Sequence, residues 1–254
     1  MIFSKRELVI FSLVLLMVIP VAGVLAQDEE TQQDQPTAVA TVNGEQITQQ
    51  ELSQAAQLRQ VYMLAMQRQL PQSFTQFLFS SEQGREFIKE YQKQVLDNLI
   101  DQKIQSQKVE ELGITATDEE VQEAVDQQIQ STIESSDQYE NEEDLKKAVE
   151  SQGNQSYEEA INGLREQLRQ SIIRNKLREQ VTGGVEVTED EMKTFYNENK
   201  ESYKEDGEVK PFEDVKEQIN NTLLERKKNE AWAEWLKEAR KNADIKKNLE
   251  ALGM

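Results

Sequence analysis

Residues 38–48 read Ala38-Val-Ala-Thr-Val-Asn-Gly-Glu-Gln-Ile-Thr48. Apolar side chains alternate with small or polar ones before and after Asn43-Gly44, a dipeptide that is typical of tight turns between strands. The pattern predicts a short strand followed by a turn. A second short strand is predicted over residues 243–249, with Ile245 facing inward. Because the two strands lie near opposite ends of the sequence, we expect them to pair and to close the structure.

From Thr48 onward, the sequence carries the start signals of helices. Four Ser/Thr-x-x-Glu boxes allow a hydroxyl to accept a hydrogen bond from a free helix N–H while the glutamate reaches back, which contributes about 1 kcal/mol each. The boxes pair Thr48 with Glu51, Thr117 with Glu120, Ser156 with Glu159, and Thr188 with Glu191. The matching helix ends are supplied by Gly113, Gly153 and Gly183-Gly184. We therefore expect a mainly α-helical protein of open architecture, with thin cores and one small strand pair.

Two long segments carry apolar residues at helical spacing. One helix is predicted from about Gly84 to Leu112, and we expect it to be the central core helix. Its apolar stripe includes Ile88, Tyr91, Val95 and Leu99. The last helix is predicted to begin at Pro211, because proline suits the first turn of a helix. Its apolar positions are Phe212, Val215, Ile219, Leu223, Ala231, Trp235 and Ala239.

The first 26 residues have the composition of an export signal. Lys5 and Arg6 precede an apolar run over residues 8–19, and Pro20 leads to a small-residue site that ends at Ala26. We predict cleavage after Ala26 and, after it, a flexible linker over residues 27–37 that is rich in Gln, Asp and Glu. The alternative is an uncleaved membrane anchor, because residues 8–25 are about long enough to cross a bilayer.

Charge and composition exclude several classes of function. The chain has 29 Lys and Arg against 48 Asp and Glu, a formal net charge of −19, which disfavours nucleic-acid binding. It contains no His and no Cys, so the commonest acid/base group, the commonest metal ligand and all thiol chemistry are missing. Acidic residues gather at 138–144 and 198–208 but lack the oxygen spacing and glycine of a calcium loop. We expect no metal and no cofactor.

Two further segments have a recognisable order after residues 38–48. Residues 95–104 read Val-Leu-Asp-Asn-Leu-Ile-Asp-Gln-Lys-Ile, and residues 113–121 read Gly-Ile-Thr-Ala-Thr-Asp-Glu-Glu-Val. Together these segments resemble the N-terminal chaperone domain of the SurA and PrsA family, exported folding factors that usually carry a parvulin-type prolyl isomerase. The resemblance continues through residues 144–174 and 187–200. It implies a helical chaperone region over 38–183, completed over 184–254 by a lead-in helix, a long C-terminal helix and a strand.

The segment after Tyr203 departs from the pattern of that family, which places its parvulin domain there. Here seven residues, from Lys204 to Lys210, separate Tyr203 from Pro211. Parvulin sites resemble one another in using paired histidines, and this chain has none. The resemblance therefore implies the chaperone part of the family without its isomerase, and we predict that the protein is not an enzyme.

A stretch rich in methionine and aromatic residues is the candidate surface for contact with unfolded clients, because such side chains repack against varied partners. We place the phenylalanines on a loop between Pro71 and Ser80-Ser81. Burial in the core is the alternative for the methionines, since they recur at helical spacing. Trp232, three residues before Trp235, is a further candidate, with packing between helices as its alternative. The full candidate set is Tyr62, Met63, Met66, Leu70, Phe74, Phe77, Leu78, Phe79 and Trp232.

The resemblance makes a non-catalytic exported holdase the leading hypothesis, with unfolded or partly folded exported polypeptides as partners. We expect it in the periplasm or on the extracytoplasmic face of the membrane, with membrane contact only through an uncleaved N-terminal segment. One alternative is an envelope adaptor or scaffold that binds one folded partner. Another is an enzyme that uses carboxylates alone, such as a glycosidase, although no apolar pocket that would raise the pKa of one carboxyl group is evident in the sequence.

Overall fold

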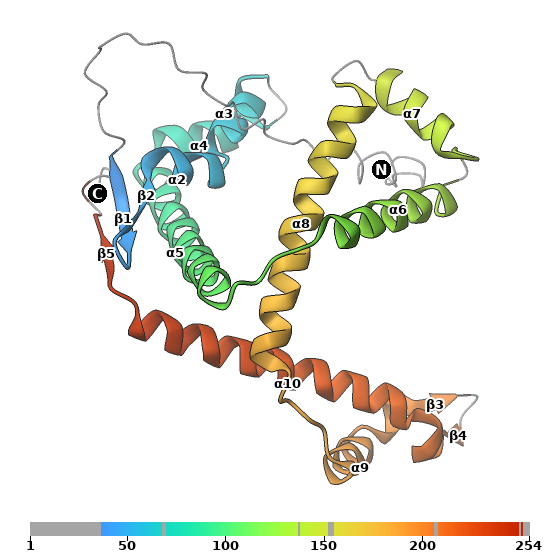
Figure 1. The fold of residues 1–254 in the computed structure, drawn as a ribbon. Helices are drawn as coiled ribbons and strands as arrows, with labels where there is room; N and C mark the ends of the chain where they lie inside the picture. Colours follow the sequence, from blue (N-terminus) through green and yellow to red (C-terminus); the bar gives the residue numbers. More distant parts are fainter. Residues whose placement is uncertain are drawn as a thin grey trace. The chain divides into compact units, whose positions relative to one another are not determined.

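The computed structural model describes residues 37–67, 70–136, 138–151, 155–205, 208–248 and 250. The predicted signal, residues 1–26, and residues 27–36 of the predicted linker lie outside the described residues. The helical class predicted from the sequence is confirmed (Figure 1). By its contacts, the chain divides into two compact units. The sheet unit comprises Gln32–Glu111 and Arg178–Met254, and the three-helix unit comprises Leu112–Leu177.

A small antiparallel sheet joins the two ends of the described chain. Its order is β2-β1-β5, with β1 at Ala38–Val42, β2 at Glu45–Thr48 and β5 at Ile245–Lys247. The predicted pairing of the terminal strands is confirmed, with Val42 opposite Ile245 (Figure 1). Asn43 and Gly44 both have positive φ in the turn, and the amide N–H of Asn43 donates to the carbonyl of Asp244 at 2.9 Å. The turn therefore pairs β1 with β2 and also contacts Asp244, the residue before β5.

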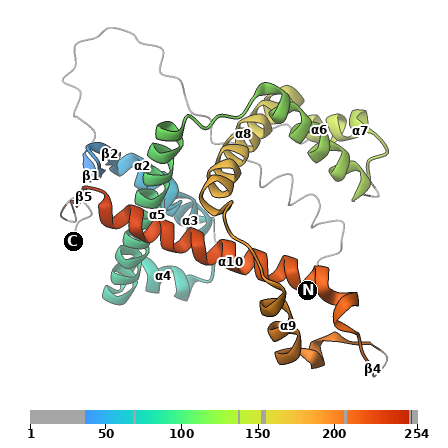
Figure 2. The same ribbon diagram turned by 60° about the horizontal axis from the view of Figure 1, so that its bottom comes forward.

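After β2 the sheet unit continues with a series of helices. They are α2 (Gln49–Ala55), α3 (Leu58–Met66), α4 (Gln72–Ser80) and α5 (Glu82–Leu112). In both ribbon views α3 and α4 lie beside the N-terminal half of α5 (Figures 1 and 2). The first core is formed by Val39, Ala40, Val42 and Ile47 of the sheet, Leu52 and Ala56 at α2, and Val95, Leu96, Ile100 and Ile104 of α5. Leu236 and Ala239, from the last helix, pack against it.

The apolar stripe predicted for α5 is only partly buried. From Val95 onward its side chains pack into the first core, as expected for a central core helix. Tyr91 is instead an exposed large hydrophobic residue, and so is its neighbour Phe87. The prediction was therefore wrong for Tyr91, whereas Ile88 is half-buried, because the first core begins only at Val95.

An ion cluster ties α5 to the C-terminal end of the chain. Arg240 donates to Asp97 at 2.6 Å and to Asp101 at 2.8 Å, and Lys247 of β5 donates to Asp97 at 2.7 Å. Burial tends to raise the pKa of Asp97, but the hydrogen bonds from Lys247 and Arg240 outweigh it, so the pKa is lowered. Burial prevails at Asp101, and its pKa is raised. The cluster gives α5, the last helix α10 (Phe212–Asn242) and β5 a shared polar contact beside the apolar core.

A second core lies where α9 meets the first half of α10. These helices span Glu189–Glu198 and Phe212–Asn242, and α10 starts after Pro211, as predicted. Met192 of α9 packs against Val215, Ile219 and Leu223 of α10. Between the helices lie a 3-10 turn, η1 (Lys200–Tyr203), and the paired strands β3 (Lys204–Glu205) and β4 (Glu208–Val209). The short polar link expected after Tyr203 is thus a small hairpin.

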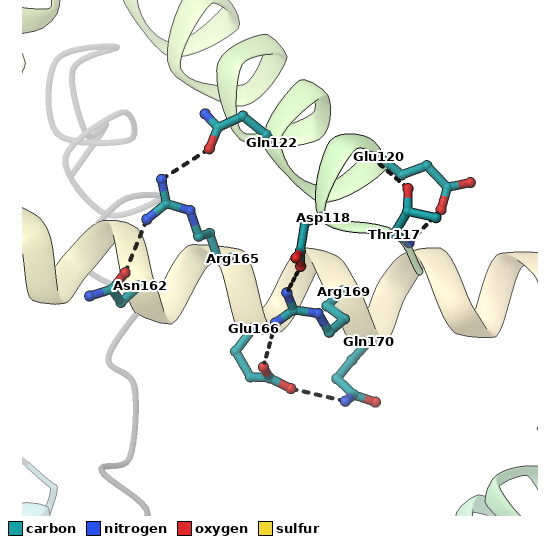
Figure 3. Close-up of polar contacts among 9 residues, drawn as sticks. All are labelled: Thr117, Asp118, Glu120, Gln122, Asn162, Arg165, Glu166, Arg169 and Gln170. Atoms are coloured by element: carbon teal, nitrogen blue, oxygen red, sulfur yellow. Dashed lines mark hydrogen bonds and ion pairs between the residues drawn. The ribbon is translucent and has the colours of Figure 1, made fainter. Parts of the chain in front are cut away.

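The three-helix unit is held together by polar contacts as well as by apolar ones. It contains α6 (Asp118–Glu134), α7 (Glu142–Ser151) and α8 (Tyr157–Thr182), of which the last residues belong to the sheet unit. Arg165 and Arg169 lie one helical turn apart on α8 and point toward α6, where they donate to Gln122 at 3.0 Å and to Asp118 at 2.9 Å (Figure 3). The hydroxyl of Tyr157 donates to Glu142 at 2.9 Å, which links α8 to α7.

All four predicted capping boxes form. In each box the backbone N–H of the glutamate donates to the cap hydroxyl, at 3.2–3.3 Å, and the glutamate accepts from the backbone N–H of the cap residue. Gly113 ends α5 with a positive φ, and α8 ends at Gly183-Gly184. Gly153 lies outside the described residues. Across the parts of the chain that the structure describes, no helix has both the length and the apolar character to cross a bilayer.

The capping box at the start of α9 keeps the pKa of its glutamate carboxyl group unusually low. Hydrogen bonds from Lys227, and then from Thr188, lower the pKa of Glu191 from 4.5 to about 2. Because the pKa is lowered by folding, the stabilisation is present above pH 4.5 and is lost as the pH falls towards 2. We expect Lys227→Met to raise the pKa of Glu191 in a carboxyl NMR titration, and Lys228→Met to leave it unchanged. A wild-type pKa near 4.5 would contradict the prediction.

Candidate functional site

The candidate phenylalanines lie on a helix and not on the loop that the sequence suggested. They belong to α4, which starts after Pro71 and ends where the N–H and the hydroxyl of Ser81 both donate to the carbonyl of Phe77. Pro71 makes no side-chain cap bond, but it precedes α4 in the same way that Pro211 precedes α10, so the sequence did carry a local signal for the start of this helix. Helix formation places Phe74 and Phe77 one turn apart, on one side of α4.

Most of the large hydrophobic side chains that are exposed in the described residues gather on three neighbouring helices. Tyr62 and Met63 of α3 and Phe74 and Phe77 of α4 are each about half exposed, at 47–51%. Exposure of Met63 contradicts the alternative that it is buried in the core. Two more members were missed by the sequence reasoning: Phe87, 61% exposed, and Tyr91, 38% exposed, both on α5. We call these six side chains the aromatic surface: Tyr62, Met63, Phe74, Phe77, Phe87 and Tyr91.

The remaining candidates lie elsewhere or deeper in the fold. Leu78 is only 5% exposed, because it sits where α4 meets α5, and it is therefore removed from the set of contact residues. Leu70 and Phe79 are half-buried, and the ring of Phe79 contacts that of Tyr62 edge to face, with centroids 5.6 Å apart. The side chain of Met66 lies outside the described residues.

Trp232 lies on α10 and is not part of the aromatic surface. Its ring packs against that of Trp235, with centroids 4.6 Å apart, and both residues are half-buried. Neither tryptophan is among the exposed large hydrophobic residues. Trp235 also lines a pocket with Ile104 and Ala239, beside the first core.

A close approach of backbones sets the position of α4 on α5. A Cβ atom at Gly84 would lie 2.5 Å from the carbonyl oxygen of Leu78 and closer still to that of Phe77, so only glycine fits there. The N–H of Gly84 donates to the hydroxyl of Ser81 at 2.9 Å, and Arg85 donates to the carbonyl of Ser80 at 3.1 Å. These contacts fix the corner between the helices and so set the position of α4, which carries Phe74 and Phe77.

A groove of about 610 Å³ runs along one side of the aromatic surface. Its apolar lining comes from Phe87, Tyr91 and Leu96 of α5. Two ion pairs border it, Lys93 with Glu90 at 3.1 Å and Lys247 with Asp97 at 2.7 Å. The groove could accept an apolar side chain from a partner, because three of its lining side chains are apolar and its charged ones are already paired with each other.

The α3 and α4 part of the aromatic surface differs in charge from the chain as a whole. Residues 52–81 contain no Asp or Glu, and α4 carries no charged residue, although the net charge of the chain is −19. No group of three or more acidic residues among those the structure describes is arranged to hold a metal ion. The arrangement therefore offers apolar contact and amide hydrogen bonds from the exposed Gln72 and Gln76, and no described reactive group stands within it.

The fold has a counterpart among solved structures. A structure from Campylobacter jejuni, described as one of two structurally related SurA-like chaperones, superposes with a TM-score of 0.54 at 14% identity. The match covers 83% of this chain and 98% of that one. At this identity the likeness concerns the fold alone.

Similarity in sequence points the same way. A foldase protein PrsA of Clostridium botulinum strain Hall is 32% identical over 176 residues, which cover 66% of this chain and 47% of that protein. A PrsA of Caldanaerobacter subterraneus is 26% identical over 200 residues, 78% of this chain and 54% of that protein. This chain thus spans about half the length of these relatives. The sequence model of the SurA-like N-terminal domain matches residues 2–143, more than half of the chain, and the chain belongs to that family.

Proposed function

We propose that this protein is an exported chaperone that holds apolar segments of unfolded or newly translocated polypeptides and has no catalytic step of its own. The observation that carries the proposal is the aromatic surface, which exposes six large apolar side chains on three adjoining helices. Soluble proteins rarely leave such a group uncovered unless it meets a partner. Membership of the SurA-like family and the PrsA relatives support a chaperone role.

The composition of the aromatic surface suits clients of many sequences. Aromatic rings bury a large area with few rotatable bonds, and methionine adapts its shape to irregular partners. The surface lies on helices that are held by Gly84 and the first core, so binding needs no folding of the chaperone itself. The acidic remainder of the chain would keep a chaperone–client complex soluble by charge repulsion.

The absence of a catalytic step is part of the proposal. It is supported by the short hairpin of β3 and β4 at the position where relatives of this kind carry their isomerase, and by a sequence without histidine. Export to the periplasm or the extracytoplasmic face, with residues 1–26 as the signal, remains a prediction from the sequence. The boundaries of the chaperone region, 38–183 and 184–254, are also a prediction from the sequence.

Substitution at the aromatic surface tests the proposal. The purified chain should suppress aggregation of a chemically denatured model client at equal molar amounts, as followed by light scattering. Phe74→Ser combined with Phe77→Ser removes the exposed half of two phenylalanine rings, which a bound client would cover. Loss of this apolar contact predicts a loss of client affinity of roughly 10- to 100-fold. The double variant should fold normally, because both side chains are already half exposed.

The matched control removes apolar area of similar exposure elsewhere. Leu112 and Val209 are also exposed, at 40% and 37%, and lie outside the aromatic surface, so Leu112→Ser with Val209→Ser should leave protection unchanged. Equal loss in both double variants, or protection by neither wild type nor variant, would refute the proposal. Binding of one folded envelope protein, with no affinity for unfolded clients, would favour the adaptor hypothesis instead.

A further inference from the structure

A pocket of about 360 Å³ lies between the second half of α5 and the last turns of α10, and it shares no residue with the aromatic surface. Its lining residues span 104–111 on α5 and 235–242 on α10, in each case at offsets of three, four and seven residues from the first. Residues at these offsets share one face of a helix, so two helix faces line the pocket. Asn43 of the β1–β2 turn also lines it, and all of these residues belong to the sheet unit.

The apolar part of the pocket is built on the first core. Ile104 belongs to that core, and Ala239 packs against it. Trp235 adds an aromatic ring, which is held in place because the ring of Trp232 packs against it with centroids 4.6 Å apart. An aromatic ring presents a flat apolar face, which suits the C–H groups on one side of a sugar ring as well as an apolar side chain. The apolar lining therefore favours a ligand with one flat apolar side.

The polar part of the lining separates the ligand classes. It consists of three carboxamides, two carboxylates and one ammonium group: Asn43, Gln107, Asn242, Glu111, Glu238 and Lys108. An apolar side chain of a client would cover these groups without bonding to them, which costs free energy. A phosphate would meet two negative charges against one positive charge. Neutral hydroxyl groups donate as well as accept hydrogen bonds, so they suit carboxylates, carboxamides and the ammonium group alike.

Two ion pairs at the pocket leave its carboxylates able to accept further hydrogen bonds. Lys108 lies 2.7 Å from Glu111, and Lys241 lies 3.5 Å from Glu238. The side chains of the two glutamates are nevertheless 66% and 48% exposed, and an ionised carboxylate has about four acceptor positions. One lysine therefore does not saturate either carboxylate.

Hydrogen bonds fix one wall of the pocket and leave other groups available. Gln107 donates to a carbonyl of β1 at 3.0 Å and accepts from the carboxamide of Asn43 at 2.7 Å. The side-chain oxygen of Asn43 accepts from the N–H of Asp244 at 2.8 Å. The carboxamide of Asn242 and the indole N–H of Trp235 have no hydrogen-bond partner among the residues that the structure describes. The pocket thus combines a preorganised wall with groups that a ligand could bond.

From these features we propose that the pocket between α5 and α10 binds a short neutral saccharide. One side of a sugar ring packs on Trp235 and Ile104, and its hydroxyl groups exchange hydrogen bonds with Asn242, Glu238 and Gln107. This function goes beyond the holding of clients, because the pocket and the aromatic surface are formed by different residues. The chain could therefore hold a glycan at the pocket and a client on the aromatic surface at the same time.

An NMR titration of the isotopically labelled full chain tests the binding. The probes are soluble trisaccharides of glucose and of N-acetylglucosamine, added up to about 50 mM. With at least one of them, we expect the indole signal of Trp235 and the carboxamide signals of Asn43, Gln107 and Asn242 to shift and to saturate. The dissociation constant should be about 1 mM, because hydrogen bonds to the sugar replace hydrogen bonds to water. Absence of a saturable shift with both sugars would overturn the proposal.

An alanine substitution tests the location of the site. Asn242 is exposed and has no hydrogen-bond partner in the described part of the chain, so Asn242→Ala should fold normally and bind the sugar about 3- to 10-fold more weakly. The control is Asn221→Ala, which changes an exposed asparagine of α10 outside the pocket and should bind as the wild type does. Equal affinities of the two variants would place the sugar elsewhere and refute the site.

A client peptide separates saccharide binding from the proposed function. An unfolded peptide rich in aromatic residues should leave the signals of the pocket unchanged, and Phe74→Ser with Phe77→Ser should not alter the affinity for the sugar. If the peptide displaces the sugar, the pocket is part of the client surface, and the saccharide proposal is wrong while the chaperone function stands. If the sugar binds but no client is protected, the saccharide site stands and the proposed chaperone function fails.

Discussion

Replacing Gly84 with alanine should displace α4 and remove most protection of unfolded clients. The new Cβ would lie 2.5 Å from the carbonyl oxygen of Leu78 and closer to that of Phe77, and both are backbone atoms that no side-chain rotation can move away. Overpacking of this kind costs about 1–3 kcal/mol, more than the gain of up to about 1 kcal/mol from replacing glycine inside a helix. The corner between α4 and α5 would open, and Phe74 and Phe77 would move with α4.

Hydrogen exchange and client protection together report this change. We expect faster exchange at the amides of α4 in Gly84→Ala, a lower melting temperature, and client affinity reduced about as far as in the Phe74→Ser, Phe77→Ser variant. Gln83→Ala is the control, because Gln83 is exposed in the same turn of α5 and should leave all three measurements unchanged. Wild-type protection by a Gly84→Ala protein would show that the position of α4 is not important for client binding.

Ile100→Ala should lower the free energy of unfolding of the sheet unit more than Gly84→Ala does. The side chain of Ile100 is fully buried in the middle of α5, in the core it shares with β1, β2 and α2. Ile100→Ala removes buried methyl and methylene groups and leaves a cavity, at a cost of about 2–5 kcal/mol. Since domains are commonly stable by only about 5–15 kcal/mol, the loss would be a large fraction of the total.

Urea unfolding followed by tryptophan fluorescence measures this loss. Both tryptophans of the chain lie on α10, and Trp235 stands beside Ile104 and Ala239, so its emission reports on this core. The exposed Asn98, two residues away on the same helix, supplies the control, since Asn98→Ala should change the free energy of unfolding by less than about 0.5 kcal/mol. A loss below about 1 kcal/mol for Ile100→Ala would mean that the core can collapse around the missing groups.

The parts of the fold that the sequence predicts correctly depend on interactions between near neighbours. Asn43-Gly44 forms its turn because both residues tolerate positive φ, and each capping box needs only a hydroxyl and a glutamate three residues apart. Pro211 marks the start of α10 for a similarly local reason. The pairing of β1 with β5 was also anticipated, although its register, Val42 opposite Ile245, emerges only in the folded chain.

The candidate site was harder to predict, because it depends on contacts between helices. Pro71 precedes α4 as Pro211 precedes α10, so the start of α4 had a local signal, but the position of the helix depends on the approach of the α5 backbone at Gly84. The spacing of apolar residues on α5 is the same before and after Val95, yet the first core covers only the later ones, and Phe87 and Tyr91 stay exposed. Phe87 and Tyr91 were therefore missed, and Leu78 was wrongly included.

By itself the sequence determined the helical class, the turn at Asn43-Gly44, the helix starts and the family resemblance, because each follows from residues close together or from their order along the chain. The tertiary structure decided which side of each helix is covered. Helical spacing shows which residues share a face, but burial depends on whether another element packs on that face. Another element packs on Leu78 and on Ile100, so both are buried. Large parts of the rings of Phe74, Phe77 and Phe87 stay uncovered. The surface proposed for clients is therefore visible only in the fold.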